Sequence, residues 1–319
     1  MGETKTVFFI GDVAMDEYYS APYFPKIKEK ILVQTLPAQM GGMIANAACV
    51  YAGYGAPVSF LTALNPGEVS KALCKGLNEA GIDTEFMVWD ESLPDAKTII
   101  ILAEGEHTVF IPTLNLQRIE LSGEAMEALR KADYIYSTFC ELRPLRFGEM
   151  TACRVLEDVK SRGCRLWVDL DVADIQDGDE ALFGYVDTLF VNEKGYENLE
   201  KRAGGDVCAW LYGKGVQRLI VTQAEKGCTV YCRDEETFSV DGLKVPVVDV
   251  TGAGDTFCSS FLYGYTREME LRQCAKFANY AASRAVTELG ARAGAVGAEA
   301  VLDWVERHGG DRAEFEKFL

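Results

Sequence analysis

The chain has 319 residues, of which 48% are hydrophobic and 25% are charged, a composition typical of a soluble globular protein. Its formal net charge of −17 argues against a nucleic-acid partner, since binding a polyanion relies on dense Lys and Arg. No apolar run approaches the ~20 residues needed to cross a bilayer. The apolar start of the chain is interrupted at Gly11 and Asp12, too soon for a secretory signal, so we expect a cytoplasmic protein with no nucleic-acid or membrane partner. The ten cysteines include no Cys-x-x-Cys pair, which favours reduced, packed thiols over a zinc site.

The first predicted element is a short buried strand over 6–10, followed by the acids Asp12 and Asp16. In open α/β sheets, ligands bind outside the carboxyl ends of the strands, which is where these two carboxylates would lie. They could equally be ordinary loop acids, because the sequence alone does not separate the two interpretations.

Two later stretches, 17–40 and 97–112, differ in character from the rest of the chain. The first is aromatic and then alternates between apolar and polar residues from Ile27 to Val33, which predicts exposed strands. The second is predicted to be a hairpin that turns at 104–106. A small sheet made from these two stretches could not bury both of its faces by itself.

A glycine turn at Gly41 and Gly42 precedes an alanine-rich predicted helix that carries Asn46. Small residues let such a helix lie close against its neighbours. Packing and a turn alone would therefore explain this pattern.

Strands and helices then alternate along the chain. Helices are predicted at 67–80, 122–131, 145–162, 178–184 and 205–213, and strands at 58–64, 134–138, 165–169, 188–192 and 218–222. This alternation predicts right-handed βαβ units on a mostly parallel central sheet flanked by helices. Polar residues stand where these strands stop, namely Glu141, Asp169, Asn192 and Thr222. Each could be a helix cap or a turn former, but together they mark the edge at which the crevice of such a sheet opens.

The stretch 249–265 combines a glycine turn with a helix start. A β-branched run over 245–250 predicts a strand before the turn, and aromatic residues at helical spacing predict a helix after it. A helix that begins at a glycine turn presents unpaired N–H groups and the positive end of its dipole to an anion. Asp255 alone could be a first-turn acid that complements the dipole, but this leaves the two glycines and the Asp249–Thr251 pair unexplained.

Two better-known glycine motifs do not fit, because Phe257 stands where a dinucleotide fingerprint needs a third small residue and the chain has no Gly-Lys-Ser/Thr. The string Asp249-Val-Thr-Gly-Ala-Gly-Asp255 instead resembles the second signature of the ribokinase-like (PfkB) carbohydrate kinases. Gly41-Gly42-Met-Ile-Ala-Asn46 resembles the first signature of that family. The resemblance implies one ribokinase-like kinase domain over 1–319, a three-layer α/β sandwich with a small β-sheet lid contributed by the two stretches described above.

The resemblance also implies roles for individual residues. Asp255 would be the catalytic base, beside an anion hole formed by Gly252, Ala253 and Gly254. The acceptor would be bound by Asp12, Asp16, Gly41, Gly42, Asn46 and Glu141. ATP would be bound by Asn192, Thr222, Gly227 and Asn279, together with Gly252 and Gly254. Glu193 would hold Mg²⁺ through a water, and Asp249 with Thr251 would hold a monovalent cation such as K⁺.

Three positions depart from the family motifs. Gly195 stands where a Glu is expected, Ala224 replaces a usual glycine, and Asp169-Leu-Asp171 replaces the common Asp-x-Asn. These changes weaken the transfer of Mg²⁺ ligation to any one residue, although Mg²⁺ is often held mostly by phosphates and waters.

We therefore expect an ATP- and Mg²⁺-dependent kinase that phosphorylates a hydroxyl of a small sugar and forms a homodimer through the lid. The alternatives are a kinase for nucleosides or for phosphorylated sugars, and a sugar-binding regulator that has lost the chemistry. The acids of the acceptor site favour a neutral sugar. An anionic acceptor stays open because of the nearby cations Lys26, Lys28, Lys30, Lys97, Arg143 and Arg146.

Overall fold

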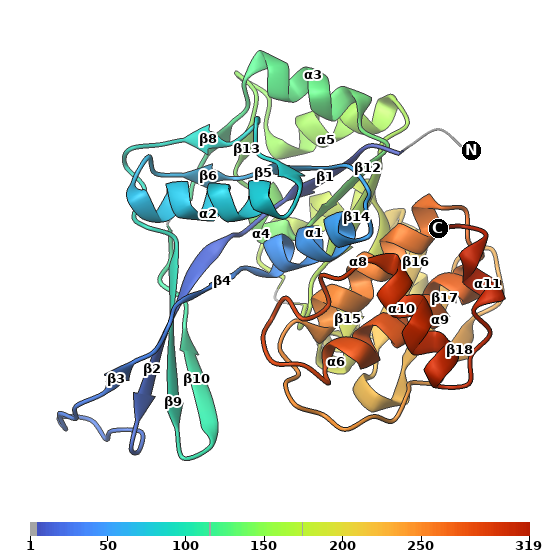
Figure 1. Cartoon of the computed structure of the whole chain (residues 1–319). Helices are drawn as coiled ribbons and strands as arrows, with labels where there is room; N and C mark the ends of the chain where they lie inside the picture. Colours follow the sequence, from blue (N-terminus) through green and yellow to red (C-terminus); the bar gives the residue numbers. More distant parts are fainter. Residues whose placement is uncertain (1–4, 115, 174) are drawn as a thin grey trace.

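The computed structural model describes residues 5–114, 116–173 and 175–319 (Figure 1). Within these residues the central sheet contains β1 (Val7–Ile10), β5 (Val58–Leu61), β7 (Ile82–Asp83), β12 (Tyr134–Ser137), β14 (Arg165–Asp169), β15 (Val186–Asn192), β16 (Arg218–Thr222), β17 (Cys228–Cys232) and β18 (Phe238–Val240). Their spatial order is β18-β17-β16-β15-β14-β12-β1-β5-β7. All pairings from β7 to β16 are parallel, and β17 and β18 continue the sheet in antiparallel fashion. The mostly parallel α/β architecture is therefore confirmed.

Helices cover both faces of this sheet. One face carries α1 (Met43–Gly53), α2 (Glu68–Glu79), α8 (Ala253–Thr266), α9 (Leu271–Ala285), α10 (Ala298–Arg307) and α11 (Ala313–Glu316). The other carries α3 (Gly123–Lys131), α4 (Phe139–Leu142), α5 (Ala152–Ser161), the 3₁₀ helix η1 (Asp179–Tyr185), α6 (Glu193–Ala203) and α7 (Val207–Lys214). Successive side chains of β1 point to opposite faces, so that Phe9 enters the first core and Phe8 the second.

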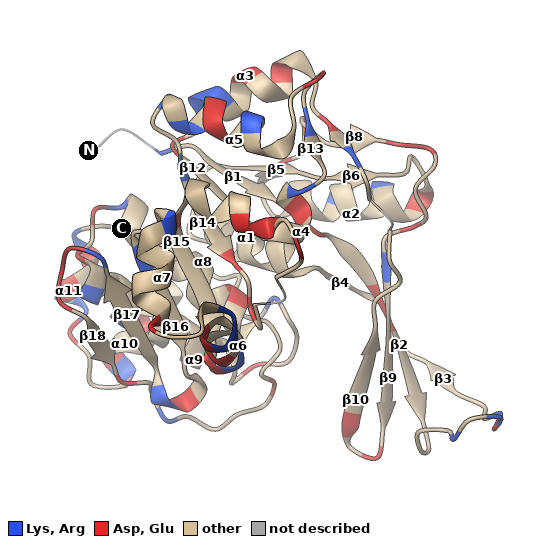
Figure 2. Ribbon diagram, turned by 180° about the vertical axis from the view of Figure 1, so that it is seen from behind, with Lys and Arg blue, Asp and Glu red and all other residues tan. Residues whose placement is uncertain are grey.

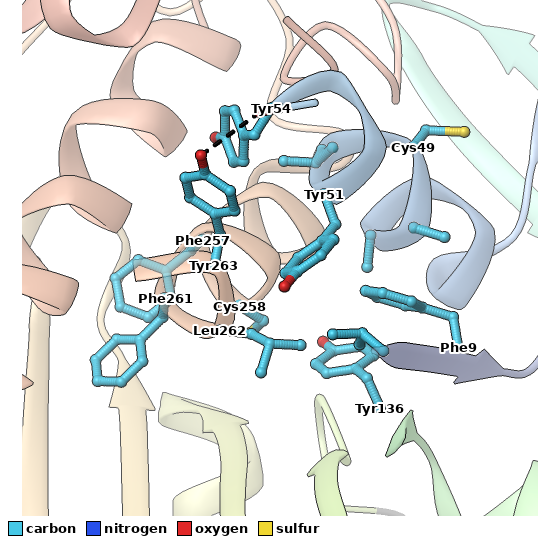
Figure 3. Packing of buried hydrophobic residues seen from close by; sticks show 14 of the residues in the cluster. Phe9, Cys49, Tyr51, Tyr54, Tyr136, Phe257, Cys258, Phe261, Leu262 and Tyr263 are labelled. Atoms are coloured by element: carbon cyan, nitrogen blue, oxygen red, sulfur yellow. Dashed lines mark hydrogen bonds between the residues drawn. The ribbon is translucent and has the colours of Figure 1, made fainter. Parts of the chain in front are cut away.

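An aromatic cluster fixes α8 between the sheet and its neighbouring helices (Figure 3). The ring of Tyr51 on α1 lies 5.7 Å from that of Phe9 and 5.6 Å from that of Tyr263 on α8. The ring of Tyr54 lies 4.7 Å from that of Tyr263, and its hydroxyl is 2.6 Å from Ser260 Oγ. Offset aromatic contacts add stability beyond the buried area, and a paired hydroxyl avoids the cost of a buried unsatisfied group. The helix that carries Asp255 is therefore held rigidly.

A second sheet projects from the body of the molecule (Figure 1). It contains β2 (Ala14–Ala21), β3 (Gln34–Thr35), β4 (Gln39–Gly41), β9 (Lys97–Ala103) and β10 (Glu106–Phe110), with β2 parallel to β9. The hairpin turn falls at Glu104 and Gly105, both with positive φ, as the sequence predicts. The expected strand from Ile27 to Val33 is absent: this segment lies in the connection between β2 and the two-residue β3 and pairs with no described strand.

Two further predictions from the sequence differ from the structure. The helix expected at 145–162 begins only at Ala152, because residues 145 and 146 form β13, which pairs with β11 (Ile119–Glu120). The remaining short strands, β6 (Ala63–Leu64) and β8 (Val88–Trp89), form another two-stranded sheet. The helix expected at 178–184 is the 3₁₀ helix η1.

Acidic and basic residues are interspersed along α6, as the colours of its ribbon in Figure 2 show. None of the helices in the described parts of the chain combines the length and the apolar character needed to cross a membrane.

Candidate active site

The first turn of α8 is built on a glycine that cannot be replaced without strain. Gly252 precedes the helix with φ +76°, and a Cβ at this position would lie 1.9 Å from the carbonyl oxygen of Ala291. The first N–H groups of a helix have no intrahelical partner. Gly252, Ala253 and Gly254 line a cavity at this turn. The Ala253 N–H donates to the Val250 carbonyl at 3.2 Å, whereas the structure gives the N–H groups of Gly252 and Gly254 no backbone partner among the described residues.

The predicted strand over 245–250 does not form. Its residues have no strand partner, and the N–H groups of Val248 and Asp249 donate instead to the carbonyl of Val286, at 2.8 and 3.2 Å. The side chains of Val245, Val247 and Val250 line the cavity. The β-branched run thus forms an apolar wall of the site, which explains why its hydrophobicity does not mark a buried strand.

Asp255 stands in the first turn of α8 and receives a hydrogen bond from a distant segment. Asn46 Nδ2 donates to Asp255 Oδ2 at 3.0 Å, and Asn46 itself is buried. Desolvation raises the pKa of Asp255 well above its usual range, the Asn46 hydrogen bond opposes this, and the charges of Asp169, Asp12 and Asp171 add to the rise. A carboxylate with a raised pKa is a stronger base toward a hydroxyl proton.

Asp12 contributes to this site by binding the first backbone N–H groups of α1. Its two carboxylate oxygens accept hydrogen bonds from the N–H groups of Met43 and Ile44, at 2.9 and 3.0 Å. A Cβ at Gly42, whose φ is +103°, would lie 2.6 Å from the Asp12 carbonyl oxygen. Desolvation raises the pKa of Asp12, and the backbone donors lower it. The carboxylate therefore anchors the helix that carries Asn46.

Asp16 lies on β2 of the projecting small sheet, opposite Gln39 of β4 and Thr98 of β9. A Cβ at Gly41 would lie 2.0 Å from Asp16 Oδ2, so any larger residue at 41 would displace the Asp16 carboxylate. Desolvation raises the pKa of Asp16, while a hydrogen bond from Thr98 and the charge of Arg292 lower it. Asp16 thus connects the lid strands to the rest of the candidate acceptor site.

Glu141 lies on the short helix α4, close to Asp12. Burial and the charge of Asp12 raise its pKa to about 8. The carboxyl group is therefore mostly protonated at neutral pH and can donate a hydrogen bond. Of the two arginines that follow it, Arg143 pairs with the buried Asp179 at 2.5 Å and Arg146 donates to backbone carbonyls at 2.8 and 2.7 Å.

The cavity beside the first turn of α8 has a volume of about 940 Å³, in the range of pockets that hold small molecules and cofactors. It brings together all the residues expected to bind ATP, namely Asn192, Thr222, Gly227, Gly252, Gly254 and Asn279. Asn279 Nδ2 donates to the carbonyls of Val240 and Asp241, both at 3.2 Å. Within the described parts of the chain, the residues expected to bind the acceptor do not line this cavity. One of them, Asn46, contacts the cavity residue Asp255 through its hydrogen bond.

The structure explains why Gly195 replaces the expected Glu. A Cβ at Gly195 would lie 2.2 Å from the carbonyl oxygen of Asp171, which has φ +46°. Asn192 caps α6 by accepting from the Gly195 N–H at 2.8 Å, and its Nδ2 donates to Asp171 Oδ1 at 2.6 Å. The Asp171 backbone thus occupies the space that a side chain at 195 would need.

The residues expected to hold metal ions are already hydrogen-bonded or paired. Glu193 forms an ion pair with Lys226 at 3.0 Å. Asp249 Oδ1 accepts from the N–H and the hydroxyl of Thr251, at 2.9 and 2.7 Å, and Oδ2 accepts from the Gly290 N–H at 2.9 Å. Burial alone would raise the pKa of Asp249, but these donors lower it, so it is ionised at neutral pH. Among the described residues, no group of three or more His, Cys, Asp or Glu side chains is arranged to hold a metal ion.

Arg292 belongs to the site, although the sequence motifs did not identify it. Its Nε donates to Asn46 Oδ1 at 3.1 Å. The only signal in the sequence is one cationic side chain within the small-residue loop Gly290-Ala-Arg-Ala-Gly294.

Comparison with known proteins gives a consistent result. The family model described as pfkB family carbohydrate kinase matches residues 4–296. The chain is 24% identical over 310 residues to a protein named ribokinase from Haemophilus influenzae, covering 95% of this chain and 99% of that protein. It is 28% identical over 275 residues to fructokinase-2 of Oryza sativa subsp. japonica, covering 79% and 80% of the two chains. Its fold matches the structure of Arabidopsis thaliana ribokinase complexed with ribose and ATP, with a TM-score of 0.80 at 22% identity, covering 96% of this chain and 99% of that one.

The family model spans nearly the whole chain, and the fold matches that of a solved ribokinase over 96% of this chain. The chain therefore belongs to the pfkB family of carbohydrate kinases.

Proposed function

We propose that this protein transfers the γ-phosphoryl group of ATP to a hydroxyl of a small sugar or sugar-like acceptor, with Asp255 as the base. One observation carries the proposal. The Asp255 carboxylate accepts a hydrogen bond from Asn46 and stands in the same helical turn as Gly252 and Gly254, which line the 940 Å³ cavity. A base and an anion site within one turn of helix meet the two needs of phosphoryl transfer to an alcohol.

In this mechanism the γ-phosphoryl group lies against the first turn of α8, where the backbone N–H groups of Gly252 and Gly254 would stabilise its developing charge. The Ala253 N–H donates to the Val250 carbonyl at 3.2 Å, so Ala253 contributes to the anion hole only if this contact is exchanged for the phosphate. Asp255 accepts the proton of the acceptor hydroxyl while the new O–P bond forms. The bond between the γ-phosphorus and its bridging oxygen breaks, and ADP leaves. The raised pKa of Asp255 strengthens it as a base, and the Asn46 hydrogen bond helps to keep it ionised for this step.

The acceptor lies on the side of Asp255 that faces α1 and β2, where Asp12, Asp16, Asn46 and Glu141 gather. Two of the cations that could have served an anionic acceptor, Arg143 and Arg146, are committed to Asp179 and to backbone carbonyls. Lys97 is paired with Glu17 at 3.0 Å. These commitments remove Arg143, Arg146 and Lys97 from the cations that could hold an acceptor phosphate, which needs cationic or N–H donors when buried. Together with the carboxyl groups of Asp12, Asp16 and Glu141, they favour a neutral acceptor, although Arg292 Nη2, beside Asn46, is a donor without a partner in the described parts of the chain.

ATP lies in the cavity lined by Asn192, Thr222, Gly227 and Asn279. Mg²⁺ bound with ATP would neutralise phosphate charge, and the carboxylates that fit it are those of Glu193 and Asp171, hard oxygen donors on the cavity wall. Most of its ligands would be phosphates and waters, since the described residues offer no three-carboxylate cluster. Asp249 and Thr251 are the proposed oxygen donors for K⁺.

A coupled ADP-release screen tests the activity. The panel contains ketoses, aldoses, sugar acids, nucleosides and their phosphates, each with Mg·ATP and with a no-acceptor control. The proposal predicts turnover with at least one acceptor well above that control. ATP and acceptor binding without ADP release for any compound would instead favour a sugar-binding regulator.

A further inference from the structure

The loop 290–294 is seated directly on the start of α8. Its first N–H, that of Gly290, donates to Asp249 Oδ2 at 2.9 Å. The Ala291 carbonyl lies against Gly252, and a Cβ at Gly294 would lie 2.0 Å from Thr256 Oγ1. With both of its ends in contact with the turn and first helical residues around the anion site, the loop has little freedom to move.

Arg292, in the middle of this loop, reaches across to α1. Its Nε donates to Asn46 Oδ1 at 3.1 Å, and Asn46 Nδ2 donates to Asp255 Oδ2 at 3.0 Å. Asn46 is 209 residues from Asp255 and 246 residues from Arg292 in the sequence, yet the three side chains form one continuous chain of hydrogen bonds. Arg292 Nη2 is buried and has no hydrogen-bond partner among the described residues.

The chemistry of the two end groups fixes the orientation of the amide between them. A guanidinium group can only donate and an ionised carboxylate can only accept. The amide oxygen of Asn46 must therefore face Arg292 and its NH₂ group must face Asp255. If the amide were flipped, its NH₂ group would face the guanidinium donor of Arg292 and its oxygen would face the carboxylate of Asp255. Neither contact could then be a hydrogen bond. Without Arg292, only the contact with Asp255 would remain to hold the amide.

We infer that Arg292 is a positioning residue for phosphoryl transfer, which holds the Asn46 amide in the one orientation that aligns the carboxylate of Asp255. This inference rests on the proposed role of Asp255 and extends it to a residue that touches neither reacting group. Since the loop also contacts the anion site at Gly252, Arg292 places the base in a fixed relation to the transferring phosphate.

The test compares Arg292→Met with a control on the same loop. Arg284 Nη1 donates to the Ala293 carbonyl at 3.1 Å and contacts neither Asn46 nor Asp255, so Arg284→Met removes a loop contact and leaves the chain of hydrogen bonds intact. Arg292→Met should lower kcat by about 10- to 100-fold, the usual cost of a small misplacement of a catalytic group, with the KM for ATP nearly unchanged. Arg292→Lys should recover part of the loss, and Arg284→Met should stay within about 2-fold of wild type.

A double-mutant cycle separates positioning from general loop stability. If Arg292 acts through Asn46, the kcat of Asn46→Ala combined with Arg292→Met should equal that of Asn46→Ala alone. The inference would be overturned if the losses in kcat of the two single variants multiply in the double variant. Equal losses in kcat in Arg292→Met and Arg284→Met would also overturn it.

Crystal structures of the two variants give a readout that does not depend on turnover. The contact between Asn46 Nδ2 and Asp255 Oδ2 should be lost or disordered in Arg292→Met and kept in Arg284→Met. An unchanged contact in Arg292→Met would overturn the positioning role even if no acceptor were found. If the wild type turns over an acceptor but the losses in kcat of Asn46→Ala and Arg292→Met multiply in the double mutant, the positioning role of Arg292 is wrong. The proposed function would still stand in that case.

Discussion

The side-chain amide of Asn46 donates to the carboxylate of Asp255, joining helices whose first turns lie about 210 residues apart in the sequence. Asp12 anchors the first turn of α1, and the glycine turn at Gly252 starts α8, so each partner stands at a helix start that is held by another segment. The contact between Asn46 and Asp255 thus links the candidate acceptor site to the nucleotide cavity.

Replacing Gly195 by Ala should destabilise the protein. The new Cβ would lie 2.2 Å from the Asp171 carbonyl, and a backbone group cannot move aside as a flexible side chain can. We expect a loss of about 1 to 3 kcal/mol in the free energy of unfolding, the usual cost of overpacking. Equilibrium urea unfolding measures this loss.

Gly213→Ala is the matched control. Gly213 lies in α7, and no atom lies within 4 Å of the added Cβ. Alanine should therefore stabilise that helix by up to about 1 kcal/mol. Equal stability changes in the two variants would contradict the close approach at Gly195.

Some of the site follows from local sequence and some does not. Asp255, Gly252 and Asn46 were predictable because each belongs to a contiguous motif at a helix start. Arg292 was not, because its partner is 246 residues away and the loop that presents it has no periodic pattern. The run 245–250 was wrongly predicted to be a strand, because β-branched residues can line an apolar cavity as well as a buried sheet. The antiparallel strands β17 and β18 were missed, since the alternating βα pattern carries no signal for where it stops. The helix α6 was also missed, because only one helix, that at 205–213, was expected between the strands that became β15 and β16.

The Glu141 carboxyl group should produce a pH dependence on the alkaline side. Its pKa of about 8 means that it is protonated and able to donate at pH 7, and ionised next to Asp12 at pH 9. We expect the KM for the acceptor to rise as the pH passes through about 8, and Glu141→Gln, which keeps a donor, to remove that rise. Steady-state kinetics from pH 6.5 to 9.5 measures it. The same rise in both proteins would contradict the assignment.

The raised pKa of Glu141 also has a consequence for stability. Between the unfolded pKa near 4.5 and the folded pKa near 8, the folded protein binds a proton that the unfolded chain has released. The contribution of this group to stability is therefore full below pH 4.5 and falls with rising pH until about 8. Glu141→Gln should gain stability relative to wild type from pH 5 to pH 8. A constant difference across that range in denaturant unfolding would count against the raised pKa.

Potassium should activate the enzyme through the turn that contains Asp249 and Thr251. The ionised Asp249 carboxylate lies beside Gly290 and the start of α8, so a cation bound there would steady the anion site. We expect a higher kcat in KCl than in tetramethylammonium chloride at the same ionic strength, and a smaller difference in Asp249→Ala. Equal rates in the two salts with the wild-type protein would rule out this cation site.

The lid carries apolar side chains that a monomer would leave in water. Ile27 and Leu32 are 93% and 94% exposed, and Tyr23, Phe24, Phe110 and Ile111 are also exposed on the same small sheet and its loops. Exposed apolar patches of this kind commonly mark interfaces, so we expect a homodimer through the lid. Light scattering should give twice the 35.1 kDa chain mass at micromolar concentration, and Ile27→Asp with Leu32→Asp should give the monomer. Leu289→Asp, an exposed apolar residue outside the lid, is the control and should stay dimeric. A monomeric wild-type protein would contradict the interface.

The rate of ADP release by Asp255→Asn, with Mg·ATP and an acceptor that the wild type turns over, tests the assignment of the base most directly. Asparagine keeps the size of the side chain but cannot take the hydroxyl proton. We predict that kcat falls by about 10² to 10⁴-fold, the usual worth of a positioned base, while the affinity for ATP stays close to that of the wild type. Because the buried carboxylate is costly when charged, the variant should also melt at a higher temperature than the wild type at pH 8, which shows that it is folded. A folded Asp255→Asn protein with near-normal kcat would contradict the account.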